Sequence, residues 1–310
     1  MKLGVTADLH GNLRLAKKFA SYFKKSDVDA IVIAGDLPAY ENQKTSLTKI
    51  LQIFSKCGKR VFVMPGSHES VKIYEVVLKK FKKKIVDCTK EKNRKVQIGD
   101  YDIVFLPGSD WLGAEDAGFI LRDSRKIFRG KTQRQIAKYY STRKVKLFYI
   151  HELKKLVKNP AKTVLISHIP PKFNKKSAID VAKFGKAVGK FKIKAADKEA
   201  TKGLMKFWQG FYKEHVFALS EALKLKKKGY PMTIIQENRG NKVLKMMIKK
   251  LKIKKLVCAH IHESGGHAND LKGKPVTPDK WSKELFYNCS GRAGIVEFEG
   301  NLSRYRNIKV

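Results

Sequence analysis

Short runs dominated by apolar residues recur along the chain, and Asp, His or Gly follows closely after each. The runs cover residues 1–7, 29–34, 60–64, 162–167 and 255–259. Continuous rather than alternating apolar runs are typical of strands buried on both faces of a sheet. Apolar residues at helical spacing follow each of the first three runs, so this part of the chain predicts alternating strands and helices with mostly parallel crossovers.

Three helices are expected among these first strands. Asn12 is a candidate N-cap for a helix that ends near Lys25, because its side-chain oxygen can accept a backbone N–H of the first turn. The second helix presents an apolar face that includes Leu47 and Phe54. Ser70 is the expected N-cap of the third.

The pattern changes after residue 95. Gly99 and Asp100 interrupt the apolar-rich segment 96–106, and a turn at this point predicts a hairpin with antiparallel pairing. The sheet structure is therefore expected to be mixed. The remaining expected elements are a long helix from about 132 to 157, a helix near 241–250, and short strands at 285–289, 294–298 and 302–308.

Residues 172–236 differ in character from the rest of the chain. They are rich in Lys, and Leu204, Trp208 and Phe211 recur at helical spacing. We predict a mostly helical insertion or cap within a single domain of residues 1–310, with a small separate lobe as the alternative. The aromatic stripe favours packing against a core over the stacking of nucleic-acid bases.

The charge of the chain is strongly positive. Lys and Arg number 67 against 28 Asp and Glu, which gives a formal net charge of +39. One interpretation is a polyanionic partner such as RNA or DNA. The other is a bias toward Lys, or a charge-rich surface of the kind found in thermophiles. Much of the excess is Lys, in runs such as 82–84 and 226–228, whereas bidentate nucleic-acid contacts favour Arg. Both interpretations stay open.

The cysteine pattern argues against a zinc ribbon or a disulfide framework. The four cysteines are Cys57, Cys88, Cys258 and Cys289, and no two form a C-x-x-C motif. They are expected to be buried thiols in a reducing compartment. No apolar run has the length of a signal-peptide core or of a bilayer-spanning helix. We expect a cytoplasmic protein without a membrane partner.

Carboxylates and imidazoles follow the predicted strands repeatedly. These residues are Asp8, His10, Asp36, His68, His168, His260 and His262. A single histidine at a strand end is more often a structural residue, but its recurrence at successive strand ends is difficult to assign to packing. Carboxylate and imidazole ligands without thiolate suit Mn, Fe, Zn, Ni or Co. Two such ions about 3.5–4 Å apart, bridged by a carboxylate, can activate water and hold the oxygens of a phosphoryl group.

The order of these motifs resembles the calcineurin-like metallophosphoesterase family. The series is Asp8-x-His10, Gly35-Asp36, Gly66-Ser67-His68-Glu69, His168 and Ala259-His260-Ile261-His262. The resemblance covers the strand framework from residue 1 to about 300, apart from the segment after Pro171. It implies an α/β fold, a β-sandwich of two mixed sheets flanked by helices, here with a helical insertion.

The resemblance also implies a role for each motif residue. The implied metal ligands are Asp8, His10 and His262 for one ion, Asp36 as a bridge, and His168 and His260 for the second ion. His68 is similar to the histidine that contacts the phosphate and protonates the leaving oxygen. Ser67 stands where the family usually has an Asn ligand of the second metal. A hydroxyl is a shorter and weaker ligand, so water could complete this site. Ala259 replaces the usual Gly, which is a minor steric change.

We therefore expect a hydrolase with two divalent metal ions, Mn²⁺ first, with Fe, Ni, Zn or Co as alternatives. A metal-bridging hydroxide would attack a phosphate ester in line, a phosphodiester in preference to a monoester, with His68 assisting the leaving group. His267 and Arg292 lie in glycine-containing segments and are candidate substrate-binding residues. One alternative is a nuclease that uses the basic surface on RNA or DNA. The other is a catalytically weakened binding scaffold, for which Ser67 is the only indication.

Overall fold

The computed structural model of the protein describes residues 1–113, 116–123, 145–188 and 216–309. The chain divides into two compact units. Unit 1 comprises Met1–Asp180 and Gly240–Val310, and unit 2 comprises Val181–Arg239. The chain leaves unit 1 at Asp180 and returns at Gly240, where the Gly240 N–H donates to Asp180 Oδ2 at 3.1 Å.

One large sheet of unit 1 contains most of the N-terminal strands. Its order is β17-β16-β1-β2-β3-β4. The strands are β1 (Lys2–Thr6), β2 (Ala30–Ile33), β3 (Arg60–Val63), β4 (Ile85–Asp87), β16 (Ala293–Glu299) and β17 (Leu302–Asn307). β1 to β4 are parallel, whereas β16 pairs antiparallel with both β1 and β17. This sheet is therefore mixed, with the parallel crossovers that the sequence predicts.

The second large sheet has the order β14-β15-β13-β9-β6-β5. Its strands are β5 (Lys95–Ile98), β6 (Tyr101–Leu106), β9 (Thr163–Ser167), β13 (Lys255–Cys258), β14 (Ala268–Asn269) and β15 (Leu285–Asn288). β5 and β6 form the predicted antiparallel hairpin, and Gly99 at its turn has a φ of 54°. The central pairs are parallel, so this sheet is also mixed.

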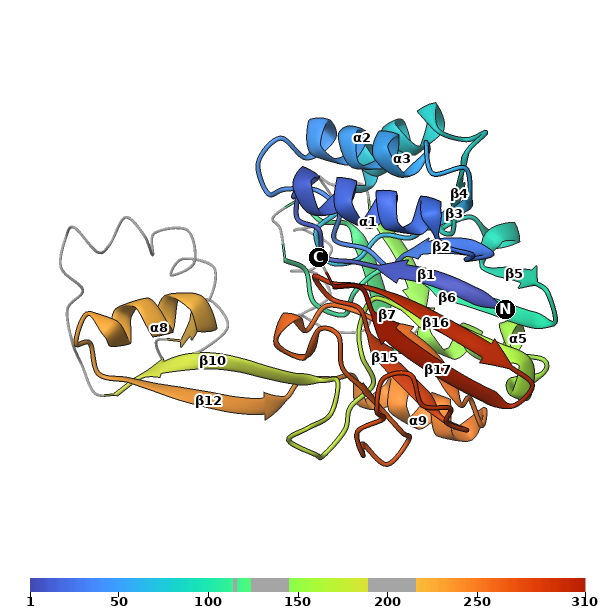
Figure 1. Ribbon diagram of the computed structural model, residues 1–310. Helices are drawn as coiled ribbons and strands as arrows, with labels where there is room; N and C mark the ends of the chain where they lie inside the picture. The colour runs from blue at the N-terminus through green and yellow to red at the C-terminus, as the bar shows by residue number, and fades with distance from the viewer. Residues whose placement is uncertain (114–115, 124–144, 189–215, 310) are drawn as a thin grey trace, which may run out of the picture. The chain divides into compact units, whose positions relative to one another are not determined.

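Helices cover the outer faces of the two large sheets, as Figure 1 shows. They are α1 (Leu13–Lys25), α2 (Gln43–Phe54) and α3 (Val71–Lys80) on the first sheet and α9 (Lys242–Lys250) on the second. The predicted N-cap Asn12 accepts the Leu15 N–H at 3.0 Å. Ile31 of β2 belongs to the core cluster that includes the helices, whereas its neighbour Val32 belongs to the core between the sheets. This alternation confirms the predicted sandwich of two mixed sheets flanked by helices.

The predicted long helix at 132–157 is wrong for the residues that the structure describes there. β7 (Phe119–Arg122) and β8 (Lys146–Tyr149) form a two-stranded parallel sheet, and the short α5 (Leu153–Leu156) follows. The pairing joins segments far apart in the chain, which a local pattern does not reveal. Residues 124–144 lie outside the described part. The short 3₁₀ helices of unit 1 are η1 (Glu91–Asn93), η2 (Ile150–Glu152), η3 (Pro160–Lys162) and η4 (His262–Ser264).

Unit 2 differs from the predicted mostly helical segment in its described residues. β10 (Val181–Ala187) pairs antiparallel with β11 (Val216–Ala218) and β12 (Met232–Asn238), and α8 (Leu219–Lys227) is the helix described beside them. Gly185 of β10 faces Ala222 of α8 so closely that a Cβ at position 185 would collide with it. Glycine therefore allows the helix to approach the strand. The aromatic stripe at Leu204–Phe211 lies outside the described residues.

No helix in the described part of the chain combines the length and the apolar composition needed to cross a bilayer. The four cysteines are free thiols, and all are buried.

Candidate metal centre

The loops that carry the candidate residues leave the carboxyl ends of parallel strands. Asp8 follows β1, Asp36 follows β2 and His68 follows β3 in the first sheet. His168 follows β9 and His260 follows β13 in the second sheet. The carboxyl ends of neighbouring parallel strands lie at one edge of each sheet, and contacts such as that between Asp36 and His168 show that the two edges lie together.

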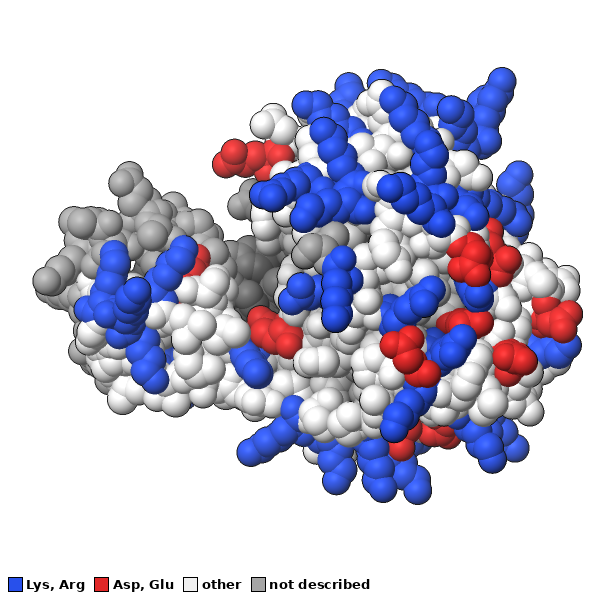
Figure 2. Space-filling view, viewed as in Figure 1, with Lys and Arg blue, Asp and Glu red and all other residues white. Residues whose placement is uncertain are grey.

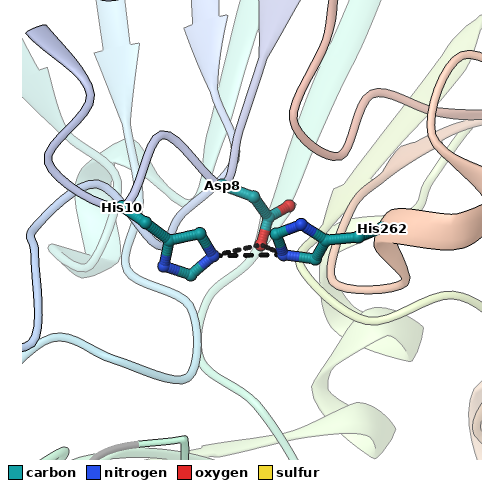
Figure 3. Close-up of side chains that lie close together, drawn as sticks. All are labelled: Asp8, His10 and His262. Carbon is teal, nitrogen blue, oxygen red and sulfur yellow. Dashed lines mark hydrogen bonds and ion pairs between the residues drawn. The ribbon is translucent and has the colours of Figure 1, made fainter. Parts of the chain in front are cut away.

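Asp8, His10 and His262 form the first group of potential ligands. Asp8 Oδ1 lies 3.7 Å from His10 Nε2 and 3.5 Å from His262 Nε2, and the two imidazole Nε2 atoms are 3.1 Å apart. Figure 3 shows both rings directed toward the same carboxylate oxygen. A carboxylate and two imidazole nitrogens within 4.8 Å of one another could hold a metal ion.

Asp36, His168 and His260 form a second group with the same composition. His168 Nε2 lies 3.2 Å from Asp36 Oδ2 and 3.2 Å from His260 Nδ1. The other nitrogen of His168, Nδ1, is 2.8 Å from the Ala34 carbonyl oxygen. A proton on Nδ1 satisfies this carbonyl and directs Nε2 toward the ligand group.

Asp36 also belongs to a third group, with His10 and His68. His68 Nε2 lies 3.6 Å from Asp36 Oδ2. Asp36 is thus the one carboxylate shared by two of the groups found among the described residues, which is the placement that a bridging ligand requires.

The loop Gly66–Glu69 holds Asp36 and is itself braced. Asp36 Oδ1 accepts from the backbone N–H groups of Ser67 at 2.5 Å and His68 at 3.0 Å, and the Ser67 hydroxyl donates to Asp36 Oδ2 at 2.7 Å. The buried Glu69 carboxylate accepts from Leu37 N and Gly66 N at 2.9 and 2.8 Å. These bonds fix the direction of the shared carboxylate.

Burial and mutual charge strongly shift the acidity of these groups. Burial acts to raise the pKa of Asp8, but the nearby imidazoles of His262 and His168 outweigh it and hold the pKa below its usual value. Burial acts to lower the pKa of His168, yet the nearby Asp36 raises it to about 10. Burial and the charge of His168 lower the pKa of His260 to about 3. Positive charge therefore gathers beside Asp36, where a bound cation would take the place of the His168 proton.

The backbone is strained at several of these residues. Asp8, His10, Asp36 and His260 have φ values of 53°, 42°, 54° and 75°, in the left-handed region that non-glycine residues seldom adopt. Each such residue costs about 1–2 kcal/mol. Strain at consecutive strand ends indicates positions that are kept for a function.

Buried polar atoms without hydrogen-bond partners indicate whether the candidate site fits a metal ion. The buried atoms Asp8 Oδ1, His10 Nδ1 and His68 Nδ1 have no hydrogen-bond partner within the part of the chain that the structure describes. Burying a carboxylate oxygen without a donor is costly. Asp8 Oδ1 faces two imidazole nitrogens, so a cation at this point would satisfy all three ligand atoms. The residues fit divalent metal ions.

Sequence reasoning missed two close neighbours of His68. The Tyr40 hydroxyl lies 3.2 Å from His68 Nε2, and the two rings meet edge to face at 4.4 Å. On another side of the imidazole, a Cβ on Gly113 would collide with His68 Nε2, so only glycine leaves the ring its space. The ring of Trp111 lies 5.6 Å from that of His260.

The two candidate substrate-binding residues lie outside the three ligand groups. The side chains of His267 and Arg292 are exposed. The loop of Arg292 is nevertheless tied to the metal centre, because its carbonyl accepts from Thr6 Oγ1 at 2.7 Å and the neighbouring Gly291 N–H donates to Ala7 O at 3.1 Å.

Comparisons with known proteins identify a family and several similar solved structures. A family model described as calcineurin-like phosphoesterase matches residues 1–264. Similar solved structures include TT1561 of Thermus thermophilus, at 12% identity, 99% coverage of each chain and a TM-score of 0.49. A second solved structure has a TM-score of 0.53, also at 12% identity and 99% coverage of both chains. At this identity the similarity concerns the fold alone. A dimetal phosphatase from Danio rerio is 10% identical over 99% of this chain and 98% of its own, with a TM-score of 0.44. A search of curated proteins finds no match.

Proposed function

Because the chain belongs to the calcineurin-like phosphoesterase family and is a metal-dependent hydrolase, we propose that it uses two divalent ions held by the residues of these groups other than His68. The observation that carries this proposal is the position of Asp36, which lies beside His168 in one group and beside His10 and His68 in another. A shared carboxylate between two imidazole-rich groups is the arrangement of a two-metal phosphoryl-transfer site.

The ligand groups divide naturally between two ions. Asp8, His10 and His262 would hold one, and His168 and His260 the other, with the shared Asp36 as the bridge. The donors are oxygen and imidazole nitrogen, which supports Mn²⁺, with Fe, Ni, Zn or Co as alternatives. The Ser67 hydroxyl is the remaining candidate ligand of the second ion. Because this hydroxyl donates to Asp36 Oδ2, we propose that it binds that ion only weakly and that the second ion is the more easily lost.

The divalent ions would supply an activated water molecule and neutralise charge on the phosphate group. Proton transfer to the leaving group depends on the protein's side chains. His68 is buried, its Nε2 lies 3.6 Å from Asp36 Oδ2, and Tyr40 and Gly113 lie beside its ring, so we assign to its imidazole the delivery of a proton to the leaving oxygen. The Tyr40 hydroxyl, 3.2 Å from His68 Nε2, fixes the direction of that ring.

We favour phosphodiesters as substrates, because the chain has a net charge of +39 and a phosphodiester is often part of a larger polyanion. Arg292 and His267 are the proposed substrate contacts. Arg292 has the reach for a phosphate, since the base of its loop is hydrogen-bonded to the strand and loop that carry Asp8.

Two further proposals concern the chain as a whole. Unit 2 would be an insertion in the catalytic domain, which is supported by the hydrogen bond between Gly240 N and Asp180 where the chain leaves and returns. A cytoplasmic location is supported by four buried cysteines that remain free thiols.

The proposed function is tested by hydrolysis of a bis-aryl phosphate and of the matching aryl phosphate, with and without Mn²⁺. The His68→Ala variant should lower kcat by about 10²–10⁴-fold without losing bound metal. His151→Ala is the matched control, because His151 is exposed and outside the ligand groups, and it should retain full activity. A folded protein that binds stoichiometric metal but hydrolyses neither ester would favour the binding scaffold.

A further inference from the structure

A basic cavity lies at the edge of the first sheet opposite to the candidate metal centre. It has a volume of about 710 Å³ and is lined by Lys82–Val86 and by Ser55, Lys56, Gly58, Lys59 and Arg60. Its basic lining residues are Lys56, Lys59, Arg60, Lys82, Lys83 and Lys84. None of the described residues that line it is acidic. The strand β3 separates the two sites, since Arg60 begins the strand and His68 follows its other end.

The topology brings the two basic segments together. They precede β3 and β4, which pair in parallel with Val61 opposite Ile85, so the loops before them are neighbours. A basic residue near the carboxyl end of a helix is favoured by the helix dipole, but this effect fades beyond the last turn. Lys59 and Lys82–Lys84 lie past the ends of α2 and α3. Helix stabilisation therefore does not account for them.

These cations have no acidic partners in the described part of the protein. No ion pair there includes any of the basic lining residues, whereas Lys95 and Arg304 elsewhere in unit 1 pair with Asp102 and Glu297. Arg60 packs its guanidinium over the Phe62 ring at 4.7 Å. A concave surface lined by charge of one sign concentrates the electric field and attracts counter-ions.

The basic surface extends beyond the cavity. Lys24 and Lys25 in the last turn of α1, and Lys79 and Lys80 in the last turn of α3, are basic as well. The Cys57 thiol donates to the Ala20 carbonyl of α1 at 3.4 Å, so α1 packs against the segment that forms one side of the cavity. Figure 2 shows Lys and Arg side chains crowded over the helices α1–α3. The basic surface is therefore extended enough to contact several phosphate groups of one strand rather than a single phosphate.

We propose that the cavity and its flanking lysines bind the phosphate backbone of a nucleic-acid strand. Lysine contacts a phosphate as a point charge and carries little information about the base, so binding should be independent of sequence. The site goes beyond the hydrolytic function, because it lies at the opposite edge of the sheet. It would anchor a strand to the protein without presenting a phosphate to the metal ligands.

The experiment measures the binding of a fluorescein-labelled 20-nucleotide RNA by anisotropy, in EDTA, at several KCl concentrations. The cavity variant replaces three exposed lysines at once, Lys82→Gln, Lys83→Gln and Lys84→Gln. We expect its affinity at 50 mM KCl to fall at least about tenfold, and the slope of log K against log salt to decrease by about 2, since each phosphate contact to a single strand contributes about 0.7.

The matched control removes the same charge from α9 and the loop after it, with Lys249→Gln, Lys250→Gln and Lys254→Gln. This variant should bind RNA within about twofold of the unchanged protein. A Lys56→Gln, Lys59→Gln variant tests the other cavity loop and should also weaken binding. Equal weakening by the cavity and control variants would show that only net charge matters and would overturn the proposal, as would the absence of RNA binding by the unchanged protein. Thermal melting confirms that each variant is folded.

Discussion

The first sheet carries charge at both ends of its parallel strands, but in opposite ways. At the carboxyl ends, Asp8 and Asp36 are buried within 4 Å of histidines. This proximity lowers the pKa of Asp8 and raises that of His168. At the amino ends, the lysines of the basic cavity are exposed or partly exposed and form no described ion pair. β3 connects the two, because it begins at Arg60 and leads to His68.

The difference shows what burial does to charge. Buried charges a few ångströms apart interact strongly, so each residue at the metal centre depends on its neighbours. Exposed charges are screened by solvent and salt, so each lysine should contribute little by itself and the cavity should act through their sum. A single substitution should therefore have a large effect on activity at the metal centre, whereas a single substitution in the basic cavity should have a small effect on binding.

The largest expected effect is that of Asp36→Asn. The amide has the same shape but lacks the charge that faces His168 at 3.2 Å, and it cannot accept all the hydrogen bonds from Ser67 and His68. We expect loss of bound metal and a fall in kcat/KM of more than about 100-fold, since weaker changes around metal ligands already cost about 10–100-fold. Metal analysis and hydrolysis measure both. Retention of two metals per chain would contradict the bridging role.

The pH dependence of metal binding should come next in size. In the metal-free protein the pKa of His168 is about 10, raised from 6.5, so a metal must displace this proton at neutral pH. His260, with a pKa of about 3, is already neutral. The affinity of the second ion should fall about tenfold for each pH unit from about 9 to 6, as His168 releases one proton; the first ion adds a pH dependence of its own, because Asp8 raises the pKa of His262 against the effect of burial. Calorimetry in buffers of different ionisation enthalpy counts the proton. Binding without proton release would exclude His168 as a ligand.

The same raised pKa has the opposite consequence for the stability of the metal-free protein. The Asp36–His168 pair contributes its full stabilisation below pH 6.5, the usual pKa of histidine, and loses it as the pH rises through about 10. Thermal melting with and without metal separates the two trends.

A smaller effect is expected for Tyr40→Phe. The substitution removes the hydroxyl 3.2 Å from His68 Nε2 but keeps the ring that packs against the imidazole. A hydrogen bond of about 0.5–1.5 kcal/mol corresponds to a decrease in kcat of roughly two- to tenfold, with unchanged metal content. Tyr22→Phe on α1 is the matched control, because Tyr22 is a partly exposed tyrosine outside the site. Equal activity of the two variants would remove Tyr40 from the site.

The smallest effect should be that of the cavity lysines on a small substrate. The variant with Lys82→Gln, Lys83→Gln and Lys84→Gln should hydrolyse an aryl phosphate within about twofold of the unchanged protein at about 0.15 M salt, because screening limits the reach of exposed charge to about 8 Å. A large loss of kcat would mean that the cavity lysines act on the metal centre in spite of screening, so that the two ends of the strands are not independent.

The resemblance of the motifs implies the sandwich, and the strand ends name the residues that the structure brings together in the three groups, whereas their role as metal ligands stays a prediction. Asp36 and His168 are far apart in the chain and follow strands of different sheets. Each lies at the carboxyl end of a buried strand, where the sequence places candidate residues, and the packing of the two sheets brings them to 3.2 Å. The hairpin of β5 and β6 is predictable because Gly99 marks its turn. These features depend on local patterns and on a general rule of sheet geometry.

Other features depend on contacts that no local pattern encodes. Tyr40 lies in a loop without periodicity, and only the folded chain brings its hydroxyl to His68. β10 carries Lys183, Gly185 and Lys186, and it becomes a strand because it pairs with the distant β12. Such non-local pairing overrides the local preference of the residues.

Gly113 offers a practical consequence for capturing the enzyme with its substrate. A single methyl group at this position would displace the His68 ring, while Asp8, Asp36 and the other histidines would keep their places. The Gly113→Ala chain should therefore load metal and bind an ester yet turn over slowly. It would serve as a trap that retains an intact substrate from a mixture, so that the retained compound could be identified by mass spectrometry.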